Sequence, residues 1–212
     1  MSLQLQHEAF CLDSMSQQLF FFDDFLGDQI QDEWTVGTWG GSSAIVDGET
    51  GGVYRLTTQN VSGHDTYIHM LAYRVFLVSK SVTGEVRIKA GAITKQQIAF
   101  YLYYSSSEQL WSYYNEIAGG AINYSEACYA AGDSQVYNSG IVATTNYIIL
   151  RMAASPVVAP HAHFYYDGVE GANSPISDHI TASYLCPYLT VVAREAVAKT
   201  LDVDYVGVRQ LT

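Results

Sequence analysis

Carboxylate side chains are the first candidates for chemistry in this chain of 212 residues. Hydrolysis of a glycosidic bond needs two carboxylates that face each other across the bond, about 5 to 10 Å apart. Asp202 and Asp204 alternate in the sequence, so they share one face of an expected strand. They lie near the end of the chain, and no third acid continues the alternation. We therefore expect no catalytic residues and a protein that is not an enzyme.

Histidine and cysteine residues indicate no stronger site. His161 and His163 share a strand face, but zinc needs at least one more ligand, and the sequence places no obvious Cys or carboxylate beside them. The spacing of Cys11, Cys128 and Cys186 matches no metal or disulfide framework. We interpret them as buried thiols, consistent with folding in a reducing cytoplasm. No nucleophile elbow, P-loop or dinucleotide motif is present.

Aromatic side chains are the other candidates, because the chain contains 17 Tyr and 3 Trp residues. A flat ring stacks on the C–H face of a sugar, and a tyrosine hydroxyl adds a hydrogen bond. However, tyrosine is also a favoured strand residue and is enriched at protein interfaces. Tyr101 and Tyr103 share one strand face and Tyr104 takes the other, so these rings do not all line one groove. The candidate glycan-binding or interface aromatics are Trp39, Trp111, Tyr113 and Tyr114.

Composition limits the partners of the protein. A net charge of −11 disfavours nucleic acid and electrostatic binding to anionic membranes. Hydrophobic residues make up 49% and charged residues only 15%, which predicts a large core and a surface partly covered by other subunits. The alternative is a monomer with a surface rich in Ser, Thr, Asn and Tyr. Residues 1–20 lack the pattern of a signal peptide, and no apolar run approaches the roughly 20 residues of a membrane span.

Strands must position these side chains, because from residue 20 onward the apolar pattern has a period of two. The clearest segment is residues 84–90, where Val86 and Ile88 alternate with charged residues, as in a half-buried antiparallel strand. The pattern predicts about a dozen strands and one short helical stretch at residues 194–199. One sandwich of two sheets accounts for this length and pattern.

Residues 1–19 differ from the remainder of the chain. Glutamines at positions 4, 6, 17 and 18 mix with apolar side chains without a strict period. The segment is either a docking arm that contacts a partner or a frayed terminus. Its apolar residues favour the docking arm.

Four segments resemble the concanavalin A-like sandwich domains of bacteriophage virion proteins. The resemblance covers about residues 20–212, and it is specific for the order of strands rather than for an activity. A further segment, residues 164–169, resembles the hairpin that carries an aromatic strand in such domains. The four segments are Phe21–Asp28 before Trp34, Gly51–Thr58, Glu85–Lys89 followed by Ile93, and Lys199–Val206.

The resemblance implies an all-β, concanavalin A-like antiparallel jelly-roll sandwich with paired termini. It divides the chain into a docking arm at residues 1–19 and a sandwich at residues 20–212. It implies a non-enzymatic structural or decoration protein of a phage capsid or tail, made in the host cytoplasm and located in the virion. The arm would dock on other virion proteins, and the sandwich would self-associate, by analogy as a trimer.

Sandwiches of this kind often hold one structural calcium ion near the joined termini, and calcium takes six to eight oxygen ligands. The candidate ligands are Asp23, Asp24, Asp202 and Asp204. The alternative is that these carboxylates are solvated or accept backbone hydrogen bonds at the rim of the sheet. No other cofactor is expected.

The same fold also serves lectins, carbohydrate-binding modules and glycan-cleaving enzymes, so the fold alone does not decide the function. The β-glucanases of this fold carry acids as E-x-D-x-E on one strand, a pattern that is absent here. The alternative function is therefore a lectin-like module that binds host-surface glycans. An open aromatic groove beside polar side chains favours this alternative, whereas buried or covered aromatics favour the structural role.

Overall fold

The computed structural model of the protein describes residues 19–27, 29–47, 52–72, 76–106, 108–115, 123–130, 133–155, 161–176 and 184–210. The docking arm and Cys11 lie outside these ranges, apart from Leu19, and so stay predictions. Within the described residues every element is a strand except η1, a 3₁₀ turn at Val78–Lys80. No helix in this part of the chain is long and apolar enough to cross a membrane.

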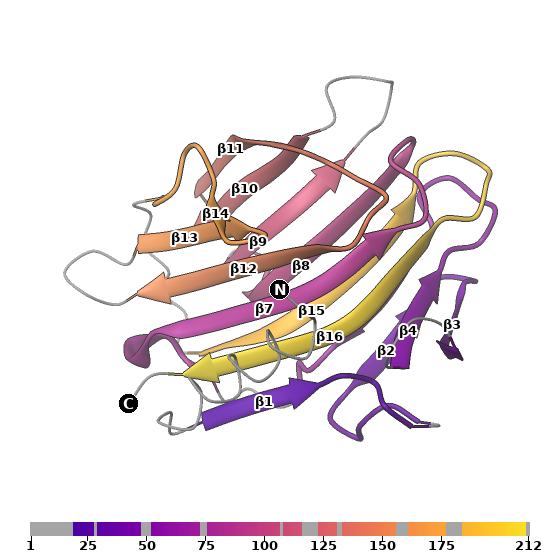
Figure 1. The fold of residues 1–212 in the computed structure, drawn as a ribbon, viewed down its shortest axis with the longest axis horizontal. Coiled ribbons are helices and arrows are strands. Elements are labelled where there is room, and N and C mark those ends of the chain that lie inside the picture. The colour runs from indigo at the N-terminus through magenta and orange to yellow at the C-terminus, as the bar shows by residue number, and fades with distance from the viewer. Residues whose placement is uncertain are drawn as a thin grey trace.

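Two antiparallel sheets stack face to face, and Figure 1 shows the first sheet lying in front of the second. The first sheet has the order β14-β13-β12-β7-β16-β4-β3, and β1 also pairs with β16. Its strands are β1 (Leu19–Asp23), β3 (Ser42–Asp47), β4 (Gly52–Thr57), β7 (Val82–Ala90), β12 (Ile148–Ser155), β13 (His161–Tyr166), β14 (Val169–Glu170) and β16 (Thr200–Gln210).

The second sheet has the order β11-β10-β9-β8-β15-β5-β2, and β6 also pairs with β15. Its strands are β2 (Thr35–Thr38), β5 (Asp65–His69), β6 (Phe76–Leu77), β8 (Gln96–Ser105), β9 (Glu108–Asn115), β10 (Asn123–Ala130), β11 (Asp133–Val142) and β15 (Tyr184–Ala193). The predicted all-β sandwich of two antiparallel sheets is confirmed.

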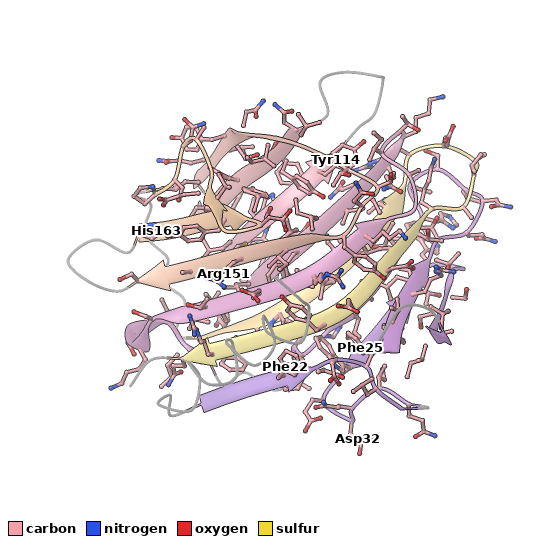
Figure 2. The ribbon with its side chains drawn as sticks, in the orientation of Figure 1. Phe22, Phe25, Asp32, Tyr114, Arg151 and His163 are labelled. Carbon is pink, nitrogen blue, oxygen red and sulfur yellow. The ribbon has the colours of Figure 1, made fainter. Side chains whose placement is uncertain are left out.

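The first and last strands of the described chain lie side by side. Strand β1 pairs with β16 in a register that runs from Leu19 opposite Gln210 to Asp23 opposite Val206. The Phe22 ring stacks on Tyr205 with 5.6 Å between centroids, beside the two strands in Figure 2. The aromatic opening segment and the closing segment thus form the paired ends that the resemblance implies.

The core fills the space between the two sheets, and β7 shows how the sequence produces it. Val86 and Ile88 are fully buried against the second sheet, whereas Arg87 points to the outer face and reaches Asp204. Glu85 also points outward, but it is buried, and hydrogen bonds from Arg151 and Tyr205 offset the cost of burying its carboxylate. The predicted half-buried strand is therefore present.

The predicted helical stretch at residues 194–199 is wrong, because residues 194–197 form bends after β15. Acceptors in other parts of the chain form hydrogen bonds with backbone N–H groups of this segment. The N–H of Arg194 donates to the Lys95 carbonyl, and the N–H of Lys199 donates to the Thr58 hydroxyl. The ion pair between Glu195 and Lys199 forms all the same, at 2.6 Å.

Candidate functional site

An aromatic strip crosses the outer face of the second sheet, which is the face turned away from the first sheet. It consists of His69 on β5, Tyr188 on β15, Tyr101 on β8 and Trp111 on β9, which lie opposite one another in register. Side chains alternate between the two faces of a strand, so the neighbours of these residues fill the core. Those buried neighbours are Ile68, Leu189, Phe100 and Leu110.

The rings of the strip touch from strand to strand without a gap. His69 and Tyr188 stack with centroids 5.6 Å apart at an interplanar angle of 5°. Tyr188 meets Tyr101 edge to face at 5.3 Å, and Tyr101 meets Trp111 at 6.0 Å. Such separations are those of aromatic pairs that attract each other, so the strip is a continuous and internally supported surface.

Further aromatic rings widen the strip. Tyr67 stacks on both His69 and Tyr188, at 5.6 and 5.4 Å. At the other end Trp111 stacks on Tyr129 at 5.9 Å and lies 6.1 Å from Tyr113. Aromatic rings therefore lie side by side on this face across five strands of the sheet.

A glycine makes room for the Tyr67 ring. Gly37 on β2 lies directly opposite Tyr67 in the ladder. A Cβ atom at position 37 would lie 2.1 Å from Tyr67 Cζ, far inside contact distance. Only glycine therefore lets the ring lie flat over the neighbouring strand.

A groove of about 290 Å³ lies on this face along β8 and β15. Three tyrosines of the face contribute to its wall together with polar side chains and a few apolar ones, the mixture found in small-molecule sites. The lining residues are Asp65, Leu71, Gln97, Tyr101, Tyr103, Ser106, Gln109, Tyr188, Thr190 and Val192.

One polar side chain of the groove is held in a fixed orientation. Gln97 Oε1 accepts a hydrogen bond from Arg194 Nη2, and Gln97 also hydrogen-bonds to the Tyr101 hydroxyl. A preorganised amide of this kind suits recognition of neutral hydroxyl groups.

Burial keeps Tyr101, Tyr188 and His69 in their neutral forms. It raises the pKa of Tyr101 to about 12, and it also raises the pKa of Tyr188, to which the Asp65 carboxylate adds a smaller contribution. It lowers the pKa of His69, so this ring is neutral at neutral pH. The tyrosines therefore remain hydrogen-bond donors throughout the physiological pH range.

The structure places the four aromatic residues suggested by the sequence in three different environments. Trp111 and Tyr113 lie together on the outer face. Tyr114, labelled in Figure 2, is buried in the core against Tyr124 and adds nothing to that face. Trp39 is 64% exposed in the loop after β2 and stacks on His64.

Sequence reasoning missed four members of this face: Tyr67, His69, Tyr129 and Tyr188. The alternation of Tyr67 and His69 predicts that they share a strand face. It does not predict that β15, about 120 residues later, lies beside them. The missing information was the pairing of strands.

The candidate calcium ligands at the termini have protein partners instead. Asp23 accepts hydrogen bonds from the Phe25 N–H at 2.8 Å and from Trp34 Nε1 at 2.7 Å. Asp24 lies next to it and accepts a long bond of 3.4 Å from the Leu26 N–H. Backbone hydrogen bonding at the sheet rim, the alternative from the sequence, describes these two residues.

The two aspartates near the end of the chain, Asp202 and Asp204, each pair with an arginine guanidinium group. Asp202 forms a bidentate pair with Arg55, at 2.6 and 2.8 Å, and Asp204 bonds Arg87 Nη1 at 2.7 Å. Among the described residues no three His, Cys, Asp or Glu side chains converge as metal ligands. Calcium binding by the four aspartates therefore stays a prediction.

The comparisons with known proteins give structural neighbours only. No family model and no curated protein matches this chain. The metal-free carbohydrate recognition domain of Emp46p matches with a TM-score of 0.66 and 10% identity, over 90% of this chain and 95% of that one. A β-1,3-glucanase from Mycobacterium marinum matches with 0.59 and 15%, over 89% and 97%. An immunostimulatory antigen and pseudo β-1,3-glucanase of Mycobacterium tuberculosis matches with 0.61 and 15%, over 91% and 98%.

At these identities the likeness establishes the fold alone. The fold is a concanavalin A-like sandwich, so the predicted fold class is confirmed. Nothing in these neighbours links the chain to a bacteriophage particle, and the virion role stays a prediction. The neighbours include both lectin and glucanase-like domains, so the absence of enzymatic activity also stays a prediction.

Proposed function

We propose that this chain is a lectin-like module that binds neutral glycans on the outer face of the second sheet. The observation that carries the proposal is the continuous aromatic strip beside a groove with fixed polar groups. The carbohydrate recognition domain named among the structural neighbours supports it.

The binding mechanism follows from the chemistry of the face. Pyranose rings present C–H groups that stack on the rings of the strip. Their hydroxyl groups exchange hydrogen bonds with the tyrosine hydroxyls and with Gln97, Gln109 and Asp65 along the groove. Because the rings already support one another, little side-chain entropy is lost when a sugar binds.

Charge favours neutral glycans over anionic ones. The net charge of the chain is −11, and Asp65 lies in the groove itself. The nearby Arg194 already donates to Gln97. Gln97 is neutral, so Arg194 keeps its positive charge, but the summed charge of the chain still repels a uronate or sialic acid.

The test is a glycan array probed with the purified chain, in calcium and then in chelator. Specific binding to neutral glycans is the expected result, and loss of binding under chelator would show that a metal takes part. The variant Trp111→Ala removes the ring in contact with Tyr101 and Tyr129. We expect it to weaken binding at least tenfold, roughly the value of one aromatic stacking contact.

The matched control is Tyr165→Ala, which removes a half-buried tyrosine from β13 in the first sheet. Its affinity should equal that of the unaltered protein. A blank array from folded protein, or equal binding by the Trp111→Ala variant, would contradict the proposal.

Hydrolysis is tested beside binding, because two of the neighbours are named for β-1,3-glucanase. Asp65 is the one acidic side chain among the described residues that line the groove, whereas glycosidases use two carboxylates. We expect no new reducing ends when β-1,3-glucan is incubated with the protein. Reducing ends that disappear in an Asp65→Asn variant would replace the binding proposal with an enzymatic one.

A structural role in a bacteriophage particle is the second proposal. The small share of charged residues, 15%, supports it, because a face with few charges suits coverage by a second copy of the chain. In this proposal the chain self-associates as a trimer, and residues 1–19 dock it on other virion proteins. Light scattering of the purified chain separates a monomer from a trimer.

A further inference from the structure

Trp39 is an exposed indole that the aromatic strip does not include. It follows β2, and 64% of its surface is accessible. Large aromatic side chains on a surface expose much apolar area, and such exposure commonly marks a contact site. Its use as a binding surface depends on how firmly the protein holds the ring in place.

The indole rests on a second ring that is itself fixed. The Trp39 and His64 rings are parallel within 8°, with 4.7 Å between their centroids. His64 Nδ1 lies 2.9 Å from Gln59 Oε1, which can only accept, so Nδ1 carries the hydrogen. The backbone N–H of His64 donates to the Val61 carbonyl at 3.2 Å. We call Trp39 and His64 the Trp39 platform.

The loop that carries Trp39 is also fixed. The Trp39 N–H donates to the Asp65 carbonyl at 2.9 Å. At Gly40, with φ +76, a Cβ would lie 2.2 Å from Gln59 Oε1, and at Gly41 a Cβ would lie 2.1 Å from Thr66 Oγ1. The two glycines therefore let the loop pack directly on its neighbours and present the indole on a rigid base.

The platform adjoins the groove of the proposed glycan site. Asp65, whose carbonyl accepts the Trp39 N–H, also lines the groove. Its partner in the ladder, Val192, is another lining residue. The platform thus lies at the Asp65 end of the groove, just beyond the edge of the sheet.

The surroundings of the platform suit a sugar better than a protein surface. Gln59, Asn60 and Ser62 are exposed polar residues of the adjoining turn. A specific protein interface buries on the order of 800 Å² on each partner, far more than one indole offers. One flat ring beside amide and hydroxyl groups matches the size and chemistry of one pyranose unit.

We infer that the Trp39 platform is an additional sugar subsite, which stacks on a pyranose ring of a neutral oligosaccharide that extends past the Asp65 end of the groove. This inference rests on the proposed glycan-binding function. It predicts that the affinity depends on the length of the glycan, because only a long oligosaccharide reaches both the groove and the platform.

The test uses β-1,3-linked glucose oligomers of two to seven units, titrated by calorimetry against the full chain. For Trp39→Ala we expect unchanged affinity for the shortest oligomers that bind and about tenfold weaker affinity for the longest. Trp39→Phe should retain most of the affinity for long oligomers. Trp111→Ala is the control, because it removes part of the strip and should weaken binding at every length.

A second readout reports on the ring itself. Trp34 is buried, so in a Trp111→Phe variant Trp39 is the one accessible tryptophan of the chain. We expect the longest oligomer to protect its fluorescence from acrylamide and the shortest to leave it accessible. Equal loss at all lengths in Trp39→Ala, no loss at any length, or no protection in a Trp111→Phe variant that calorimetry shows to bind the longest oligomer would each overturn the subsite and leave the proposed function intact. If the unaltered chain binds none of these oligomers, the subsite is overturned for this class of glycan, and the array decides the proposed function separately.

Discussion

Glu126 on β10 is a carboxylic acid on the inner side of the second sheet, and it is fully buried. Its Oε1 lies so close to Gly171 that a Cβ there would be only 1.3 Å away. In the described structure neither carboxylate oxygen accepts a hydrogen bond of good geometry. Burial therefore raises the pKa of Glu126 to about 7; the Asn173 N–H offsets part of this, and the Glu170 carboxylate adds to it.

Glu126 should make stability depend on pH. Its pKa is raised above the usual 4.5, so the folded state holds the proton more tightly than the unfolded state. The stabilisation is full below about pH 4.5 and is lost as the pH rises through 7. We expect the free energy of unfolding to fall by up to about 3 kcal/mol between these limits.

Urea unfolding at a series of pH values from 5 to 8 measures this effect. The matched variant is Glu126→Gln, which has the same shape and cannot ionise. It should lose most of the decline that the unaltered chain shows between pH 5 and pH 8. The same decline in both proteins would mean that another group is responsible.

Gly37 on strand β2 controls the position of the Tyr67 ring, which belongs to strand β5. In Gly37→Ala the new methyl group would overlap the Tyr67 ring, 2.1 Å from its Cζ. The ring must then tilt away from His69 and Tyr188, on which it now stacks. We expect glycan affinity to fall several-fold, as one supporting aromatic contact is lost.

Thr35→Ala is the control for this change, because Thr35 is an exposed residue of the same strand. Its affinity should be unchanged. Equal affinities of the two variants in the same titration would show that the position of Tyr67 does not matter for binding.

The strands could be predicted from the sequence, because the alternation of apolar and polar residues is visible without knowing which strands pair. Val86 and Ile88 in β7 are buried as their pattern predicts. The predicted short helix is wrong because the Lys199 N–H, which a helix would have bonded within the segment, donates to the Thr58 hydroxyl instead. The aromatic strip could not be predicted either, since it depends on β5 and β8 both pairing with β15. The register between strands that are far apart in the sequence is set by the tertiary structure, and a single sequence gives little information about it.

The whole sandwich is closed by its two ends. Strand β1 covers one edge of β16, and Asp23 at the end of β1 anchors Trp34 through the indole N–H at 2.7 Å. Phe21 and Phe25 also pack on Trp34, at 5.5 and 6.2 Å. Strand β1 therefore includes Leu19, the last residue of the predicted arm.

Truncation tests the division between arm and sandwich. Deletion of residues 2–18 leaves β1 intact, so the chain should remain folded and bind glycans with unchanged affinity. If the arm also mediates assembly, light scattering should show a smaller particle after the deletion. An assembly of unchanged mass would contradict the docking arm and leave the sandwich as the surface that self-associates.

A longer deletion, of residues 2–23, is the matched comparison because it also removes β1. It takes away the ring that stacks on Tyr205 and the carboxylate that holds the Trp34 indole. It also exposes the β16 edge, which then offers unpaired backbone groups to other chains. We therefore expect a lower midpoint of urea unfolding and aggregation, which the shorter deletion does not cause. Equal stability of the two truncated proteins would show that the paired ends do not hold the sandwich closed.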